Sequence, residues 1–337
     1  MSSVSVSFAD TGRSIEMTVD TSAITTTEVV RQSIEGRRFS PVNALVAFAL
    51  LFSLLSSVVI LVTLLVDTIA AAIPVFQARG FSFITASLSP RAEAAGIWQG
   101  IMGSLALTAF VIVVAFPLGV AAAVYLEEYA PDNRVTRFIN ANIRNLAGVP
   151  SIVYGILGLF LFVEVLMRGV FGASTGIAGR NVIAGGLTLA VLVLPIMIIT
   201  TSEALRAVPG GLREASFAVG ATRWETIRHH VLPVAIPAIL TGSVLTIARA
   251  FGESAPLLLA GAQLSLFFSV ASDASFFDLL SDQPYTALPI IVFNFARQPQ
   301  AEFVALTAAS IVVLLVMLLT VNAAAVLARD RFERRYR

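Results

Sequence analysis

Six apolar runs, each long enough to cross a bilayer as a helix, constrain what this 337-residue chain can fold into. A helix rises about 1.5 Å per residue, so about 20 residues cross the roughly 30 Å of hydrocarbon in a membrane. Hydrophobic residues make up 57% of the chain and charged residues 13%, which excludes an ordinary soluble domain. We therefore predict an all-α membrane protein with six transmembrane helices in a domain over 41–330. The runs lie at about 44–66, 101–126, 145–167, 181–201, 234–260 and 303–327.

Two residue types are missing, and their absence excludes several chemistries. The chain has no cysteine, which removes disulfides, thiolate nucleophiles and cysteine metal sites. It also has no lysine, because all 22 basic residues are arginine, so a Walker A phosphate loop is excluded. The two histidines, His229 and His230, are adjacent and have no third ligand nearby, so we predict no metal site. We expect no catalytic residue and no cofactor on this chain; any ATP and Mg would be bound by a partner subunit.

The arginines are distributed unevenly between alternate connections. The N-terminal segment, the second and fourth connections and the C-terminal tail hold 16 of them, against five in the other connections. Positive charge is enriched on the cytoplasmic side of membrane proteins, so both termini and the fourth connection are predicted to be cytoplasmic. Residues 1–40 are rich in serine and threonine and predict a polar, disordered extension. Residues 331–337 form a basic tail.

The fourth connection carries strong local signals for a helix, a turn and a second helix. Residues 209–211 are Pro-Gly-Gly and end the fourth span, and residues 212–219 have helical composition. Gly220 follows, where a tight turn with a positive φ favours glycine. Thr222 is a candidate N-cap, with Glu225 at the capping-box position three residues later. An ordinary amphipathic connection at the membrane surface would satisfy the same pattern.

This connection, 202–233, also contains a recognisable motif. Glu214-Ala215-Ser216, followed by Gly220 and closed by Leu232-Pro233, resembles the EAA loop of ABC importer permease subunits. Ser216 replaces the usual second alanine, and His230 replaces the usual isoleucine. In that family the loop forms a coupling helix that sits in a cleft of a cytoplasmic ATPase subunit. The resemblance therefore assigns ATPase coupling to Glu214, Ala215, Ser216, Gly220, Ala221, Thr222, Arg223 and Trp224.

Further strings, in the same order along the chain, look like the permeases of ABC phosphate importers. The string at 249–257 favours the PstA-type subunit over the PstC-type. The resemblance runs from about residue 44 to the C-terminus and implies the six-helix fold of type I ABC importer permeases, the MetI-like fold. The strings occupy residues 83–87 with 96–97, 117–119 with 125–130, 147–155, 220–224 and 249–257.

The resemblance also implies a function and a set of partners. It implies a permease that moves inorganic phosphate across the cytoplasmic membrane by alternating access. The expected partners are a homologous PstC-type permease, two cytoplasmic ATPase subunits, an external phosphate-binding protein and membrane lipid, with no nucleic acid. One alternative is an ABC permease for another oxyanion, such as sulfate or molybdate. Another is a secondary transporter or channel that needs no ATPase.

Two charged residues within the fifth span are candidates for the substrate path. Arg249 and Glu253 are four residues apart and share a helix face, and each costs roughly 2.5–3.5 kcal/mol to place in hydrocarbon. Gly252 and Pro256 can interrupt the helix beside them. We predict that Arg249 offers hydrogen-bond donors to an oxyanion and that Glu253 occupies the guanidinium when the path is empty. The alternative is an ion pair that only fixes helix packing.

Other candidate sites are weaker. Glu164 and Arg168 are spaced as a surface pair near the outer interface, and Glu203 and Arg206 are predicted at the headgroup level without a transport role. Residues 172–176 fit the G-x-S-x-G pattern of a hydrolase nucleophile. However, the only histidines are predicted on the opposite side of the membrane, so an intramembrane hydrolase is not favoured.

Overall fold

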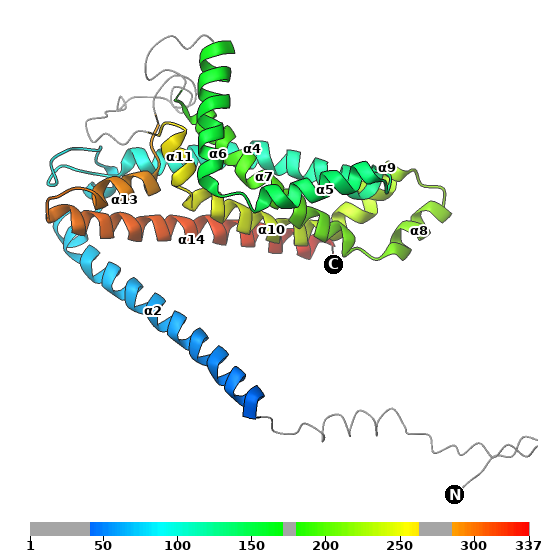
Figure 1. Ribbon diagram of the computed structural model, residues 1–337, viewed down its shortest axis with the longest axis horizontal. Coiled ribbons are helices and arrows are strands. Elements are labelled where there is room, and N and C mark those ends of the chain that lie inside the picture. The colour runs from blue at the N-terminus through cyan, green and yellow to red at the C-terminus, as the bar shows by residue number, and fades with distance from the viewer. Residues whose placement is uncertain (1–40, 171–179, 263–284, 337) are drawn as a thin grey trace, which may run out of the picture. The chain divides into compact units, whose positions relative to one another are not determined.

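The computed structural model describes residues 41–170, 180–262 and 285–336, and every regular element in those ranges is a helix (Figure 1). The described residues contain six helices that are long and apolar enough to cross a membrane. The predicted fold class, an all-α protein with six transmembrane helices, is therefore confirmed. The predicted extension at 1–40 and the G-x-S-x-G run at 172–176 lie outside the described residues.

Three of the six candidate spans combine several consecutive elements. The spans are α2 (Pro41–Arg79), α4 (Trp98–Val124) with η1 (Tyr125–Tyr129), α6 (Ser151–Gly158) with η2 (Leu159–Val170), α7 (Val182–Arg206), α9 (Arg223–Thr226) with η3 (Ile227–Val231) and α10 (Leu232–Gly252), and α14 (Glu302–Tyr336). Shorter helices lie between them: α3 (Phe81–Thr85), α5 (Arg134–Ala147), α8 (Gly210–Ala218), α11 (Ala255–Leu259) and α13 (Leu288–Ala296).

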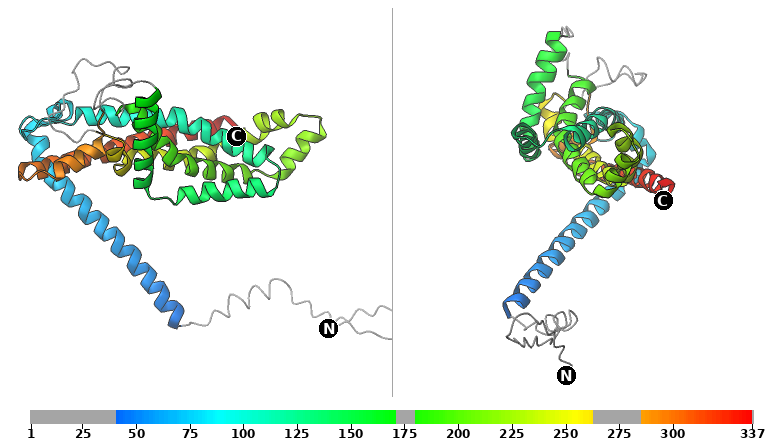
Figure 2. Two further views of the ribbon diagram at one scale, coloured as in Figure 1. Left: turned by 45° about the horizontal axis from the view of Figure 1, so that its top comes forward. Right: turned by 90° about the vertical axis from the view of Figure 1, so that its right-hand side faces the viewer.

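The long helices α4, α7, α10 and α14 lie side by side, with α7 packed against both α4 and α10 (Figures 1 and 2). Small residues let these backbones approach closely, as is usual where lipid provides no hydrophobic drive for helix association. A Cβ added at Gly242 of α10 would lie 2.7 Å from Cβ of Thr200 on α7, and one at Gly119 of α4 would lie 2.5 Å from Cγ of Met197. Within the described residues α7 is the most buried span, with 67% of its apolar window covered.

Helix α5 and helix α6 are separate elements where the sequence suggests one apolar run from about residue 145. Asn133 caps α5, with its Oδ1 accepting a hydrogen bond from the Thr136 N–H at 2.9 Å. The chain then breaks at residues 148–150, and α6 begins at Ser151. The break follows from Pro150, which lacks an N–H and disfavours a helical conformation for the residue before it. In both views α6 and η2 run across the direction of the long helices (Figures 1 and 2).

Candidate functional site

Helices α8 and α9 form the predicted helix, turn and second helix, at the end of the bundle opposite α13 (Figure 1). We call residues 209–226 the coupling segment. Gly220 has a φ of 87°, and its N–H donates to the Phe217 carbonyl at 3.0 Å. The Ala221 N–H donates to the Ser216 carbonyl at 3.2 Å, which completes a Schellman motif with Gly220 at the left-handed position. The predicted positive φ at Gly220 is confirmed.

The second helix of the coupling segment starts with the predicted capping box. The Glu225 N–H donates to Thr222 Oγ1 at 3.3 Å, and the Thr222 N–H donates to Glu225 Oε2 at 2.8 Å. These two bonds satisfy backbone donors that the first turn of a helix would otherwise leave unpaired. The turn and the cap are therefore built from residues within the segment itself.

Most of the residues assigned to ATPase coupling are exposed, but Ser216 is not. Trp224 of α9 is 54% exposed, and Val219, which precedes Gly220, is 84% exposed. Ser216 is 5% exposed, and its hydroxyl lies 2.9 Å from Oγ1 of Thr226, which is 1% exposed. The serine that replaces the family's alanine therefore joins α8 to α9 from inside the segment. Of the other assigned residues, Ala221 is half-buried, and Glu214, Ala215, Gly220, Thr222 and Arg223 are exposed.

The end of α4 that is predicted to face the cytoplasm continues into η1. Two carboxylates of η1 contact arginines in or just before the coupling segment. Oε1 of Glu128 accepts from Nη2 of Arg213 at 2.6 Å, and both side chains are largely buried. The same guanidinium donates to the carbonyls of Leu205 and Val208, both at 3.0 Å, which satisfies acceptors at the end of α7. No role is predicted for Glu128 from the sequence alone. The available signal was a pair of adjacent acids ending an apolar span, opposite an arginine-rich connection.

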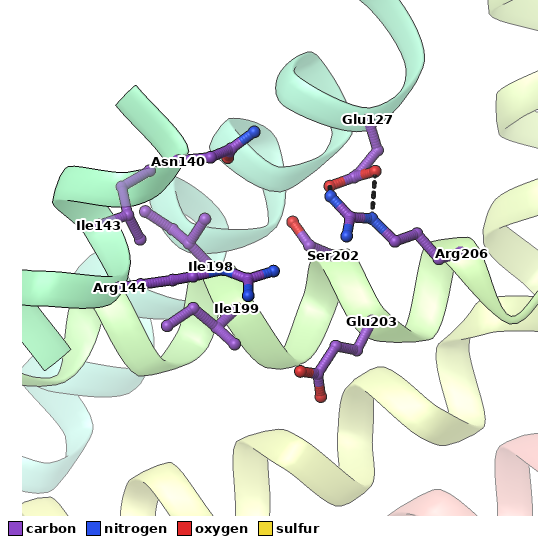
Figure 3. A pocket seen from close by; sticks show the side chains of 9 residues that line it. All are labelled: Glu127, Asn140, Ile143, Arg144, Ile198, Ile199, Ser202, Glu203 and Arg206. Carbon is purple, nitrogen blue, oxygen red and sulfur yellow. Dashed lines mark hydrogen bonds and ion pairs between the residues drawn. The ribbon is translucent and has the colours of Figure 1, made fainter. Parts of the chain in front are cut away.

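A small pocket lies beside this contact, between α5 and the end of α7 (Figure 3). The Arg206 Nε and Nη2 atoms donate to the two carboxylate oxygens of Glu127, each at 2.8 Å. Arg206 was predicted at the headgroup level without a role, and the structure makes it the partner of a residue 79 positions away. Asn140 and Arg144 of α5 and Ser202 and Glu203 of α7 also line the pocket (Figure 3).

Arg249 and Glu253 form the ion pair that their spacing suggests, at the C-terminal end of α10. Helix α10 ends at Gly252, and Glu253 has an extended backbone with a ψ of 124°. The interruption expected beside Gly252 is therefore present, and Glu253, as the C-cap residue of α10, still lies four residues from Arg249 and pairs with it. Glu253 Oε1 lies 3.4 Å from Arg249 Nε, with side chains 17% and 44% exposed.

The pair expected at the outer end of the third span, Glu164 and Arg168, has the geometry of a surface contact. Arg168 Nη1 donates to the Glu164 carboxylate at 2.7 Å, and the side chains are 30% and 41% exposed. An exposed pair of this kind contributes at most about 1 kcal/mol. Across the ranges that the structure describes, no group of three His, Cys, Asp or Glu side chains is placed to hold a metal ion.

Comparison with known proteins places the chain in a family. Residues 115–337 match the family described as "Binding-protein-dependent transport system inner membrane component". The chain is 35% identical over 238 residues to the phosphate transport system permease protein PstA of Mycobacterium leprae, covering 67% of this chain and 71% of that protein. It is 33% identical over 270 residues to PstA 1 of Mycobacterium tuberculosis strain H37Rv, covering 77% and 81%.

Two relatives from Bacillus subtilis match over a shorter stretch. The probable ABC transporter permease proteins YqgI and YqgH are 42% and 40% identical, and the chain spans about half of their length, 57% and 50%. Among solved structures, a chain of the bacterial alginate ABC transporter in complex with an alginate pentasaccharide-bound periplasmic protein has a TM-score of 0.59. It is 14% identical and covers 90% of this chain and 96% of its own, which supports the fold alone.

The fold, the family match and the relatives agree with one another. Six apolar helices in a chain of this family make it a multi-pass inner membrane protein, and the family is one of non-enzymatic transport subunits. The chain belongs to the binding-protein-dependent transport system inner membrane components and, within them, to the PstA-type ABC permeases.

Proposed function

We propose that this chain is a membrane-spanning subunit of an ATP-driven importer of inorganic phosphate. The observation that carries the proposal is the similarity to relatives named phosphate transport system permease proteins, which are 33–35% identical over most of their length. The expected complex contains a homologous PstC-type permease, two cytoplasmic ATPase subunits and an external phosphate-binding protein. The matched family, whose description is a binding-protein-dependent transport system, supports an external binding protein.

The coupling segment is the surface that we propose for the ATPase. Its exposed Trp224 and Val219 offer apolar area, while Glu214 and Arg223 offer charges at the rim of a contact. This role requires the segment and both chain termini to face the cytoplasm, as the arginine distribution predicts. ATP and Mg would then be bound by the ATPase, since this chain has no lysine for a Walker A loop.

Arg249 and Glu253 are the residues that we propose for the phosphate path. Their contact of 3.4 Å is longer than the roughly 2.7–2.9 Å of a charge-assisted hydrogen bond, so an oxyanion could displace the carboxylate. The end of α10 at Gly252 also interrupts the span beside them, as in transporters whose broken helices surround a substrate. In this proposal Arg249 binds phosphate transiently. When no phosphate is bound, Glu253 pairs with Arg249 instead.

Replacing Arg249 in the complete importer tests this function. Phosphate uptake into proteoliposomes is measured with ATP, beside the assembly of the complex. We expect Arg249→Ala to lower uptake about 10- to 100-fold, since a hydrogen bond to a charged group contributes about 1.5–3 kcal/mol. Arg249→Lys should be intermediate, because an ammonium lacks the planar donor fork. Arg168→Ala, which removes a half-exposed arginine from an i, i+4 pair elsewhere, is the matched control and should keep normal uptake.

Three outcomes would contradict the proposal at different points. Normal phosphate uptake by the Arg249→Ala variant in an intact complex would show that Arg249 is not part of the phosphate path. If sulfate or molybdate competes for uptake and phosphate does not, the transported anion is not phosphate. Uptake driven by an ion gradient in a preparation without any ATPase would show a secondary transporter.

A further inference from the structure

Three consecutive side chains of η1 contact three arginines that lie before, within and near the end of the coupling segment. We call Glu127, Glu128 and Tyr129 the η1 clamp. Their partners are Arg206 at the end of α7, Arg213 in α8 and Arg223 in α9, at 2.8 Å, 2.6 Å and, for the Arg223 Cζ over the Tyr129 ring, 5.7 Å. Figure 3 shows the first of these contacts.

The local backbone explains how one short stretch reaches three partners. The Ala130 N–H donates to the Tyr125 carbonyl at 2.8 Å, a hydrogen bond that spans five residues and marks a π-turn. A π-turn holds more residues than an α-helical turn, so its successive side chains diverge less around the axis. An α-helix would separate each pair of neighbours by about 100°. Successive side chains still leave η1 in different directions, and Glu127, Glu128 and Tyr129 each meet a different arginine.

The contact between Glu128 and Arg213 is the centre of the clamp. These side chains are 10% and 23% exposed, and the carboxylate also accepts from Arg213 Nε at 3.2 Å. Because the same guanidinium donates to the carbonyls of Leu205 and Val208, one side chain joins η1, the end of α7 and α8. Glu127 and Arg206 are more exposed, at 13% and 52%, and form the outer contact.

The route of the main chain shows what the clamp adds. Helices α9, η3 and α10 follow one another without interruption over residues 223–252, so a displacement of α9 passes directly into α10. Helix α7 is joined to α8 by a short connection. Helix α4 has no such covalent route, because it lies about 80 positions earlier in the chain, and the clamp is its polar attachment to the coupling segment. The segment itself is held together by the hydrogen bond between Ser216 and Thr226.

We propose that the η1 clamp passes the displacement of the coupling segment to α4, so that α4 and α10 move together when the ATPase acts. The inference rests on the proposed function, in which the coupling segment contacts an ATPase. Glu127, Glu128 and Tyr129 are positioning residues in this role. The clamp joins η1, at the end of α4, to α8 and to α9, which leads into α10, and in this proposal the phosphate path opens and closes correctly only when α4 and α10 respond together.

The test compares transport with ATP hydrolysis in the assembled importer. Glu128→Gln keeps the size of the side chain and removes its charge. We expect phosphate imported per ATP hydrolysed to fall at least about fivefold, while ATP hydrolysis continues, because the coupling segment still contacts the ATPase but α4 follows it only through its packing against α7 and α10. Asp132→Asn is the matched control. Its carboxylate pairs with Arg137 of α5 at 3.7 Å, beside η1 but not in the clamp, and it should keep the wild-type ratio.

A second set of variants separates coupling from folding. The double variant Glu128→Arg with Arg213→Glu restores opposite charges and should keep a higher ratio than either Glu128→Arg or Arg213→Glu alone. Where Glu128→Gln does not assemble, Glu127→Gln at the outer contact takes its place and should lower the ratio in the same direction. A wild-type ratio in an assembled clamp variant would overturn the inference. If the wild-type complex itself shows no ATP-coupled phosphate uptake, the proposed function fails instead.

Discussion

Gly220 is the position in the coupling segment where a single methyl group should have the clearest effect. Its φ of 87° lies in the left-handed region, and it closes the Schellman motif at the end of α8. A Cβ built at Gly220 meets nothing within 4 Å. The effect of Gly220→Ala is therefore conformational and does not come from a clash with neighbouring atoms.

The size of the effect follows from the cost of the left-handed conformation. An L-residue other than glycine pays about 1–2 kcal/mol there, which lowers the population of the turn about 5- to 30-fold. Asparagine visits this region more easily than alanine, and a β-branched residue does so least, so the loss should increase from Gly220→Asn to Gly220→Ala to Gly220→Val. Gly211 provides a control, because it lies in α8, has open space around it and has no positive φ.

Hydrogen exchange in the purified protein measures this population directly. The Ala221 amide, which donates across the turn, should lose about 5- to 30-fold of its protection in Gly220→Ala. Gly211→Ala should leave that protection unchanged or increase it, because alanine favours a helix by about 1 kcal/mol over glycine. Equal protection in Gly220→Ala and Gly211→Ala would refute the reasoning. So would a loss in Gly220→Asn larger than in Gly220→Val.

Two further predictions concern contacts inside the bundle and the segment. Ser216→Ala should destabilise the coupling segment by about 1–3 kcal/mol, because it leaves the Thr226 hydroxyl buried without its partner. The double variant Ser216→Ala with Thr226→Val should recover most of this loss. If hydrogen exchange shows that the losses of the two single variants simply add, the paired contact is contradicted. Gly155→Ala should lower the free energy of unfolding by about 1–3 kcal/mol, because its Cβ would lie 2.7 Å from the Pro256 Cα. Thermal unfolding in detergent measures this loss. An unchanged midpoint would contradict the close approach of α6 and α11.

The local features of the coupling segment could be predicted from the sequence because their causes are local. Gly220 tolerates a positive φ, and Thr222 and Glu225 satisfy each other's backbone donors within one turn. The six spans were predictable for a similar reason, since the length and composition of an apolar run decide whether a helix can cross a membrane. The break before α6 was missed, although Pro150 was its signal, because the apolar run continues through it.

The sequence by itself determined the class of protein, the number of spans and the chemistry of the turn, because each depends on residues within about 20 positions of one another. Only the tertiary structure decided that Glu128 meets Arg213 across 85 positions and that Ser216 faces inward to Thr226. The physical reason is that hydrophobic length and backbone preference act along the chain, whereas the choice of partner for a charged or polar side chain depends on which helices pack together.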